Sequence, residues 1–234
     1  MTSQHPSRST PRPPLTRERI LRTSLELADQ HGLEALSMRR VGQALGVEAM
    51  SLYKHVKDKD DLIDSLLDLV IAEIDVPDDA GHWKGAMRRR AISAHEVLLR
   101  HRWACPLMGS RLTLGPAMLA YVNQTFAWLL SAGFTPEQTL DAWHALDSHI
   151  YGFTLQQLNL PFAPQDSARM AAAGLELISA DHHPHFHAIV AAIVQMGGRV
   201  ERFEFGLDLI LDGLERRLTA PGDRAAGDRP TAAP

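Results

Sequence analysis

The stretch from Ser37 to Leu62, SMRRVGQALGVEAMSLYKHVKDKDDL, concentrates side chains that could recognise double-stranded DNA. Arg39 can donate two hydrogen bonds to O6 and N7 of a guanine, and Lys59 suits a phosphate. Small or apolar side chains suit thymine methyl groups, whereas hydroxyl and amino groups donate to phosphates and base edges. The outward residues of the same surface are expected to be Ala49, Met50, Ser51, Tyr53, Lys54 and His55.

Two short helices that meet at a glycine would position these side chains. Ser37 can cap the first helix, and Gly46 can end it, because glycine takes a left-handed turn without a side-chain penalty. The second helix is expected from Ala49 to His55. Four apolar residues point inward and hold the two helices crossed: Val41, Leu45, Val47 and Leu52. This is the helix-turn-helix arrangement, whose second helix lies in the major groove.

Helical periodicity continues through nearly the whole chain. We expect a first helix that Thr16 caps and Gly32 ends, and a fourth that Asp58 caps and that runs to about Asp75. Six more helical segments are expected at about residues 84–101, 116–131, 136–160, 166–180, 184–196 and 200–218. The expected fold is all-α, with nine or ten helices. Its parts are a disordered basic arm (1–15), a three-helix helix-turn-helix domain (16–60), a larger helical domain (61–218) and a disordered tail (219–234).

The helix-turn-helix stretch resembles the TetR-type (TetR/AcrR) transcriptional regulators, and its DNA-reading half is similar to the tetracycline-repressor branch. The resemblance rests on LGVEAMSLYKHVKDKDDL (45–62), on LEALSMRRVGQA (33–44) before it, and on a first helix of matching length. Ala49 and Met50 replace the polar-then-proline pair of the tetracycline repressors, so the operator sequence is not carried over. The resemblance implies DNA contacts at Met38, Arg39, Ala49, Met50, Ser51, Tyr53, His55 and Lys59.

The rest of the chain resembles the regulatory domain of the same family. The similar segments are LLRHRWACPLMGSRLTLGP (98–116), SAGFTPEQTLDAWHALDSHIYGF (131–153) and FEFGLDLILDGLERRL (203–218). The resemblance implies a homodimer whose C-terminal helices pair. It also implies that an unknown small-molecule effector binds in each regulatory domain and weakens the binding of the dimer to DNA. We therefore expect a repressor that an effector releases from a palindromic operator, although the same DNA-reading half would serve an activator.

Aromatic and polar side chains on the central helices could line the effector pocket, because such pockets are mostly apolar with a few polar groups. Aromatics at helical spacing could equally be plain core. The expected lining is Trp103, Met108, Phe126, Trp143, His144, Asp147, Tyr151 and Gln156, with Met118 and Phe153 beside it.

Two glycines lie seven residues apart on one face of the last helix. Each glycine inside a helix costs roughly 1 kcal/mol relative to alanine, and close approach of another helix would offset that cost. A dimer seam at this face would consist of Gly206, Leu209, Ile210 and Gly213, with Asp208 and Asp212 at its rim. The alternative is a tight contact within one subunit.

The segment ADHHPHFH could bind a metal through His182, His183, His185 and His187. Pro184 divides the run, and no Cys or Glu completes a known ligand spacing. We expect a polar loop between helices, without metal or cofactor, and a metal sensor is the alternative that this segment leaves open. A constitutive DNA-binding protein with a sealed core is a second alternative.

The chain shows no pattern typical of an enzyme. It has no G-x-S-x-G elbow, P-loop or dinucleotide-binding glycine pattern. His144 and Asp147 lie one helical turn apart, but no nucleophile accompanies them. We expect a regulator and not an enzyme.

Composition and charge agree with a cytoplasmic DNA-binding protein. Residues 1–60 carry ten Lys/Arg against seven Asp/Glu, whereas the remaining 174 carry fourteen against twenty-one. A basic end on an acidic body suits a chain of which only one end approaches DNA. A single cysteine, Cys105, excludes an internal disulfide and fits a reducing compartment. We expect no membrane association, because no run approaches the ~18 apolar residues of a membrane span and the N-terminus lacks a signal-peptide core.

Overall fold

A computed structural model describes residues 14–77, 82–111, 114–161, 166–198 and 202–219 of the chain. Within these ranges all regular structure is helical, with eleven α-helices and one short 3₁₀ helix, which confirms the all-α prediction. The chain divides into two compact units, Met1–Leu69 and Val70–Pro234. The boundary falls inside helix α4, nine residues after the one drawn from the sequence. Most of the expected N-terminal arm and of the C-terminal tail lies outside the described residues.

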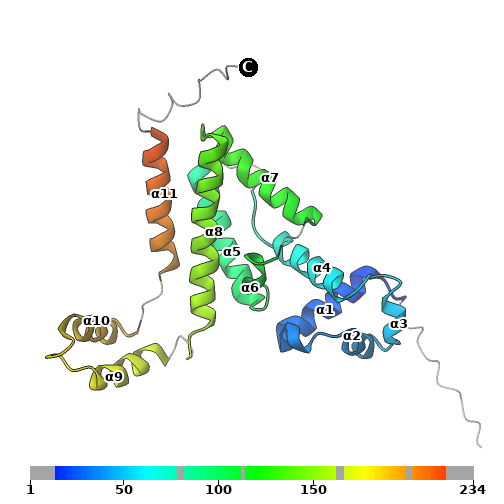
Figure 1. The fold of residues 1–234 in the computed structure, drawn as a ribbon, viewed down its shortest axis with the longest axis horizontal. Helices are drawn as coiled ribbons and strands as arrows, with labels where there is room; N and C mark the ends of the chain where they lie inside the picture. The colour runs from blue at the N-terminus through cyan, green and yellow to red at the C-terminus, as the bar shows by residue number, and fades with distance from the viewer. Residues whose placement is uncertain (1–13, 78–81, 112–113, 162–165, 199–201, 220–234) are drawn as a thin grey trace, which may run out of the picture. The chain divides into compact units, whose positions relative to one another are not determined.

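The N-terminal unit is built from α1 (Arg17–His31), the 3₁₀ helix η1 (Leu33–Ala35), α2 (Met38–Leu45), α3 (Ala49–Leu52) and most of α4 (Lys59–Ala72) (Figure 1). Three predicted caps are confirmed. The side chains of Thr16 and Ser37 accept from the backbone N–H of Arg19 and Arg40, and Asp58 accepts from that of Asp61. One apolar core holds the helices together: Ile20, Leu36, Val41, Leu52, Val56, Leu62 and Leu66.

The C-terminal unit contains α5 (Trp83–Arg100), α6 (Cys105–Met108), α7 (Pro116–Ser131), α8 (Pro136–Leu158), α9 (Ser167–Leu177), α10 (Pro184–Gln195) and α11 (Phe203–Thr219). Helix α5 packs against α7, α8 and α11, and α11 also packs against α8. Helices α9 and α10 lie side by side as a hairpin (Figure 1). Helix α8 begins with a capping box, in which Thr135 and Gln138 satisfy each other's backbone N–H groups. No helix in the described part of the chain is long and apolar enough to cross a membrane.

Ion pairs join α5 to α11 within the chain. Lys84 lies 2.7 Å from carboxylate oxygens of both Asp212 and Glu215, and Arg88 pairs with Asp208 at 2.8 Å and with Glu204. The two aspartates that we expected at the rim of a dimer seam therefore face α5 of their own subunit. These contacts fix the rotation of α11 about its axis, and with it the face that α11 leaves exposed.

Candidate functional site

The turn between α2 and α3 depends on two glycines. Gly46 adopts the left-handed conformation, with φ 70° and ψ 34°, as the sequence predicted. Gly42 lies inside α2, where a Cβ atom would stand 2.9 Å from the carbonyl oxygen of Val47 and 3.2 Å from the amide nitrogen of Ala49. The two helices can therefore cross this closely only if residue 42 has no side chain. Sequence reasoning missed Gly42, although a glycine inside an eight-residue helix is an unfavourable choice that signals close packing.

Arg17 connects the start of α1 to the turn that follows α3, the recognition helix, and to the start of α4. Its guanidinium donates to the carbonyl of His55 at 2.6 Å, to the hydroxyl of Ser65 at 2.6 Å and to Asp61 at 3.2 Å. The hydrogen bonds from Arg17 and from the backbone of Lys57 hold the pKa of Asp61 below its usual value. This arrangement ties α3 and its following turn to the ends of α1 and α4. Sequence reasoning did not single out Arg17.

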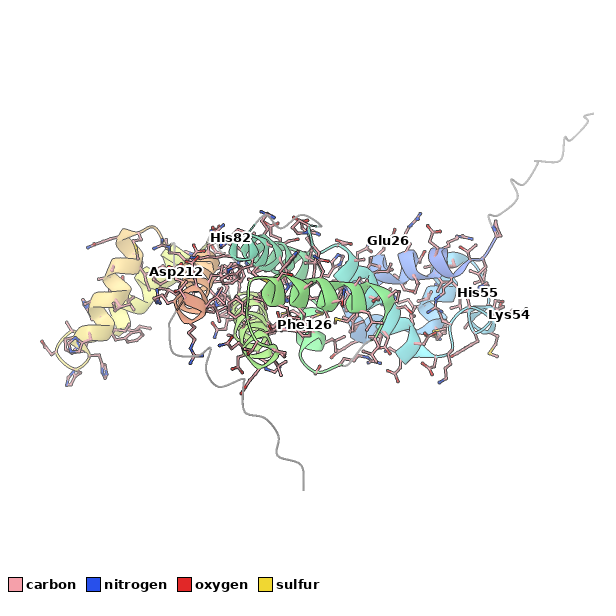
Figure 2. All side chains as sticks on the ribbon, turned by 90° about the horizontal axis from the view of Figure 1, so that it is seen from above. Glu26, Lys54, His55, His82, Phe126 and Asp212 are labelled. Atoms are coloured by element: carbon pink, nitrogen blue, oxygen red, sulfur yellow. The ribbon has the colours of Figure 1, made fainter. Side chains whose placement is uncertain are left out.

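Most of the expected DNA-contacting residues lie on the surface of this unit. Met50 is 74% exposed and Tyr53 is 45% exposed, although both side chains have large apolar parts. Figure 2 shows Lys54 and His55 close together at the periphery. The other exposed members are Arg39, Lys54 and Lys59, and the partly exposed members are Ala49, Ser51 and His55.

Two expectations about this surface are corrected. The recognition helix ends at Leu52 rather than His55, and the residues from Tyr53 to His55 form a turn. Met38 is 9% exposed and belongs to the core, so its side chain is not available at the surface. The first residue of α2 packs inward because the apolar stripe of Met38, Val41 and Leu45 faces the core.

A buried polar cluster in the C-terminal unit brings together three of the expected pocket residues. Asp147 of α8 accepts hydrogen bonds from Trp143 and Tyr151, the latter at 3.1 Å. Its other oxygen lies 2.5 Å from Arg90 of α5, whose side chain is fully buried. The Arg90 guanidinium also lies over the ring of Tyr121, with 4.7 Å from Cζ to the ring centroid. Sequence reasoning missed Arg90 and Tyr121.

Donors in this cluster outnumber acceptors. Nε and Nη1 of Arg90 and the hydroxyl of Tyr121 have no hydrogen-bond partner among the described residues. Burial lowers the pKa of Arg90, but the neighbouring Tyr121 and Asp147 outweigh this effect and the net shift is upward. Burial raises the pKa of the Tyr121 hydroxyl, so it stays protonated. Arg90 is thus a permanent buried cation whose neutralising partner is Asp147.

The remaining expected pocket residues do not join this cluster as a group. Phe126 packs edge-on against Trp143, with ring centroids 4.4 Å apart, and Trp103 is buried. His144 is exposed on the outer face of α8. Met108 lies at the end of α6, and Gln156 lies more than two turns of α8 beyond Asp147.

The structure contains a cavity of about 1110 Å³ elsewhere in the C-terminal unit. It lies between the end of α8 and the α9–α10 hairpin. Of the residues that the sequence suggested, only Gln156 and the neighbouring Phe153 line it. The segments of α9 and α10 that form its other walls were not singled out, because their apolar residues resemble those of any amphipathic helix.

Helix α11 carries the expected dimer residues. A Cβ atom on Gly206 would lie 2.6 Å from the ring of His149 in α8, so a contact within the chain accounts for this glycine. The alternative that the sequence left open therefore applies to Gly206, whereas Gly213 meets no atom closer than 4.0 Å. Leu209 and Phe205 are each 56% exposed, and Ile210 is partly exposed.

The four histidines of ADHHPHFH are divided between a turn and a helix. His182 and His183 lie in the turn before α10, and His185 and His187 lie in the first turn of that helix. Within the described residues, no three His, Cys, Asp or Glu side chains are grouped so that they could hold a metal ion. The segment is therefore half loop and half helix, rather than a loop throughout.

A helix-turn-helix unit followed by a larger helical unit defines the chain as a helical DNA-binding regulator. Residues 20–66 match the family described as bacterial regulatory proteins, tetR family, and residues 76–218 match the tetracyclin repressor-like C-terminal domain. The chain belongs to the TetR family of transcriptional regulators, as the sequence predicted, and it is not an enzyme.

Similar proteins and structures agree with this assignment. The HTH-type transcriptional repressor DrrR1 of Streptomyces coeruleorubidus is 32% identical over 92% of this chain and 82% of its own length. The tetracycline repressor protein class C of Escherichia coli is 31% identical over 88% of this chain and 93% of its own length. The crystal structure of the TetR family protein ActR of Streptomyces coelicolor in complex with actinorhodin is 30% identical. That match has a TM-score of 0.74 and covers 89% of this chain and all of the ActR chain.

Proposed function

We propose that the protein is a dimeric repressor that binds a palindromic operator and that a small-molecule effector releases from it. The observation that carries the DNA-binding part is the α2–α3 crossing, which Gly42 and Gly46 permit and which leaves Arg39, Met50 and Tyr53 exposed together. A two-fold dimer would place two recognition helices in successive major grooves, about 34–36 Å apart.

The outer faces of α8 and α11 support a dimer. Both helices expose leucines in the single chain, at 48% for Leu140 and 56% for Leu209, and Phe205 is as exposed as Leu209. Because the ion pairs to α5 hold the acidic side of α11 against its own subunit, the apolar side faces outward. Phe205 and Leu209 lie one turn apart on α11, and neighbouring exposed apolar side chains on a folded protein are typical of an interface.

We expect Leu209→Asp to shift the protein from dimer to monomer, because a carboxylate would be buried without a partner at the seam. The dissociation constant of the dimer should rise by at least about tenfold, which corresponds to 1.4 kcal/mol. Sedimentation velocity at several concentrations measures it. The control is Leu177→Asp in α9, where the leucine is 88% exposed and outside this face. Equal behaviour of both variants would exclude α11 from the interface.

The effector part of the proposal rests on the C-terminal unit. The ActR structure is a complex with actinorhodin, and this chain resembles ActR over nearly its full length. Release from DNA requires that the effector bind the two states of the dimer unequally, since equal affinity shifts nothing however tight it is. Helix α4 contains the boundary between the two units and is the natural element to transmit such a shift.

The first experiment is fluorescence anisotropy with labelled DNA from immediately upstream of the protein's own gene, in near-physiological salt with excess competitor DNA. Binding that resists the competitor supports a sequence-specific regulator and provides the assay for effectors. If the upstream DNA binds weakly, selection from a genomic fragment library follows. Failure to select any fragment would contradict the proposal.

Two variants should separate base reading from phosphate contact. Arg39→Ala is expected to cost about 1–3 kcal/mol of operator affinity and to relax the preference at one position of the site. Lys59→Ala is expected to weaken binding to all sequences alike and to lower the slope of log affinity against log salt by about one. Salt titrations of operator and random DNA measure both effects. Unchanged operator affinity in both variants would show that the DNA-binding surface lies elsewhere.

The two alternatives receive no support of their own. A metal sensor needs a cluster of ligands, which the described residues do not provide. A constitutive DNA-binding protein with a sealed core is hard to reconcile with the cavity in the C-terminal unit.

A further inference from the structure

We propose that the cavity between α8, α9 and α10 is the effector site and that it takes a large, mostly apolar molecule that is neutral or anionic, and not a cation. The inference rests on the proposed function, because it assigns a place and a chemical class to that effector. It is carried by the composition of the walls, by the charge of the lining, by one unpartnered polar atom and by the contact that holds one end of the α9–α10 hairpin.

The walls are mostly apolar. Helix α8 contributes Phe153, the α9 wall contains Met170 and Ile178, and α10 contributes Val190 and Ile193. The volume of about 1110 Å³ slightly exceeds the roughly 300–1000 Å³ typical of sites for drug-sized ligands. A molecule of several fused or linked rings would fill this space, whereas a small metabolite would leave most of the apolar surface uncovered.

The described lining offers no counter-charge for a cation. Among the described residues, the lining contains no aspartate or glutamate, and its charged residue is Arg202, just before α11. A cation that left water for this site would have no carboxylate to compensate for its lost hydration, which costs several kcal/mol. An anionic or carbonyl oxygen could instead approach the Arg202 guanidinium, which lies 5.3 Å from the ring of Phe205.

One polar atom in the lining has no hydrogen-bond donor among the described residues. Oε1 of Gln157 is buried and has no hydrogen-bond partner among the described residues. The backbone N–H groups of Gly197 and Gly198 donate to the carbonyl oxygens of Val194 and Ile193 at 3.0 and 2.9 Å, so they are not free to bind a ligand. A hydroxyl group on the effector would satisfy Gln157, because a buried acceptor without a donor costs about 1–3 kcal/mol.

The hairpin that encloses the cavity is held by a glycine contact. Gly198 has φ +78°, and a Cβ atom there would lie 2.3 Å from the amide nitrogen of Ala168 at the start of α9. The segment after α10 therefore packs directly on the backbone at the start of α9, and residue 198 cannot carry a side chain there. This contact fixes one end of the α9–α10 hairpin, so the cavity is a built feature of the fold.

The site is distinct from the buried cluster around Arg90. None of Arg90, Asp147, Tyr121 or Tyr151 lines the cavity. Three of the residues that the sequence suggested as pocket lining, Trp143, Asp147 and Tyr151, belong to that cluster. There the aspartate already accepts hydrogen bonds from three side chains. The Arg90 cluster joins helices, whereas the cavity has room for a ligand.

Three apolar dyes that differ in charge test the inference on the full-length chain without DNA. The anion is 1-anilinonaphthalene-8-sulfonate, the neutral dye is N-phenyl-1-naphthylamine, and the cation is rhodamine 6G. We expect the first two to bind one per chain and rhodamine 6G not to bind at concentrations that saturate the others. Binding of rhodamine 6G to the same site as tightly as the anion would overturn the assigned class.

Variants locate the binding. Ile193→Trp fills the cavity and should weaken both bound dyes by at least about tenfold. Its matched control is Ile189→Trp, one turn earlier on α10, where the isoleucine is 62% exposed and outside the lining. Arg202→Gln should weaken the anion about threefold and leave the neutral dye unchanged. If Ile193→Trp melts early, Met170→Trp on the opposite wall replaces it.

Equal weakening by Ile189→Trp and Ile193→Trp, or by neither, would overturn the site. Operator binding by each variant is measured in parallel, so that failure of the site and failure of the proposed function are distinguishable. If the protein binds its operator and Ile193→Trp leaves dye binding unchanged, the assignment of the site is wrong and the proposed function stands. If the protein binds no DNA and Ile193→Trp weakens dye binding as expected, the proposed function is wrong and the assignment of the site stands.

Discussion

Gly42→Ala is expected to abolish specific operator binding, with a loss of affinity of about a hundredfold, and to destabilise the N-terminal unit by about 1–3 kcal/mol. The added methyl group would lie 2.9 Å from the carbonyl oxygen of Val47 and 3.3 Å from Cα of Ala49. Both are backbone atoms, which cannot turn away as the end of a flexible side chain can. Helices α2 and α3 must therefore move apart, and the recognition helix leaves the position that its base contacts require.

A matched control is Gly85→Ala in α5, where the new methyl group would meet only the end of the Arg89 side chain, at 3.9 Å. That variant should be neutral or stabilising by up to about 1 kcal/mol, because alanine is the better helix former. All four tryptophans belong to the C-terminal unit, so their fluorescence reports its unfolding separately. We expect Gly42→Ala to leave that transition unchanged while far-ultraviolet circular dichroism detects earlier loss of helix. Wild-type operator affinity in Gly42→Ala would contradict the proposed crossing.

Local signals in the sequence predicted most of the helices. Helix α7 was predicted at its observed bounds, Pro116–Ser131, because proline and the loss of apolar periodicity mark its ends. The first helix and α2 were also predicted correctly, because Thr16, Gly32, Ser37 and Gly46 are all cap residues. The four-residue helix α6 was not predicted, since one turn contains too few residues to show a period.

Residues that act across long sequence separations escaped prediction. Arg90 is the last of three consecutive arginines, which resemble a solvated surface. The spacing of Trp83, Met87, Arg90 and Ala94 puts it on the buried stripe of α5, and this register was the available signal. Its pairing with Asp147, 57 residues away, follows only from the packing of α5 on α8. The intrachain reason for Gly206 was equally hidden, because the ring that it accommodates belongs to His149 of another helix.

The buried ion pair leads to the second large expected effect. Asp147→Ala should destabilise the C-terminal unit by about 3–5 kcal/mol, because it leaves a charged and fully buried Arg90 without its counter-ion. The same change removes the acceptor of the Trp143 indole and the Tyr151 hydroxyl. Urea denaturation followed by tryptophan fluorescence measures the loss in the unit that contains the pair.

Two companion variants separate the charge from the loss of packing. Arg90→Met combined with Asp147→Leu should recover most of the stability that Asp147→Ala loses, because replacing both partners of a buried ion pair with apolar side chains is often neutral or stabilising. Tyr121→Phe should change the free energy of unfolding by less than about 0.5 kcal/mol, because the hydroxyl that it removes has no hydrogen-bond partner among the described residues. A double variant as unstable as Asp147→Ala would mean that the shape of this cluster, and not its charge balance, holds α5 against α8. Recovery would show instead that Asp147 is there to neutralise Arg90.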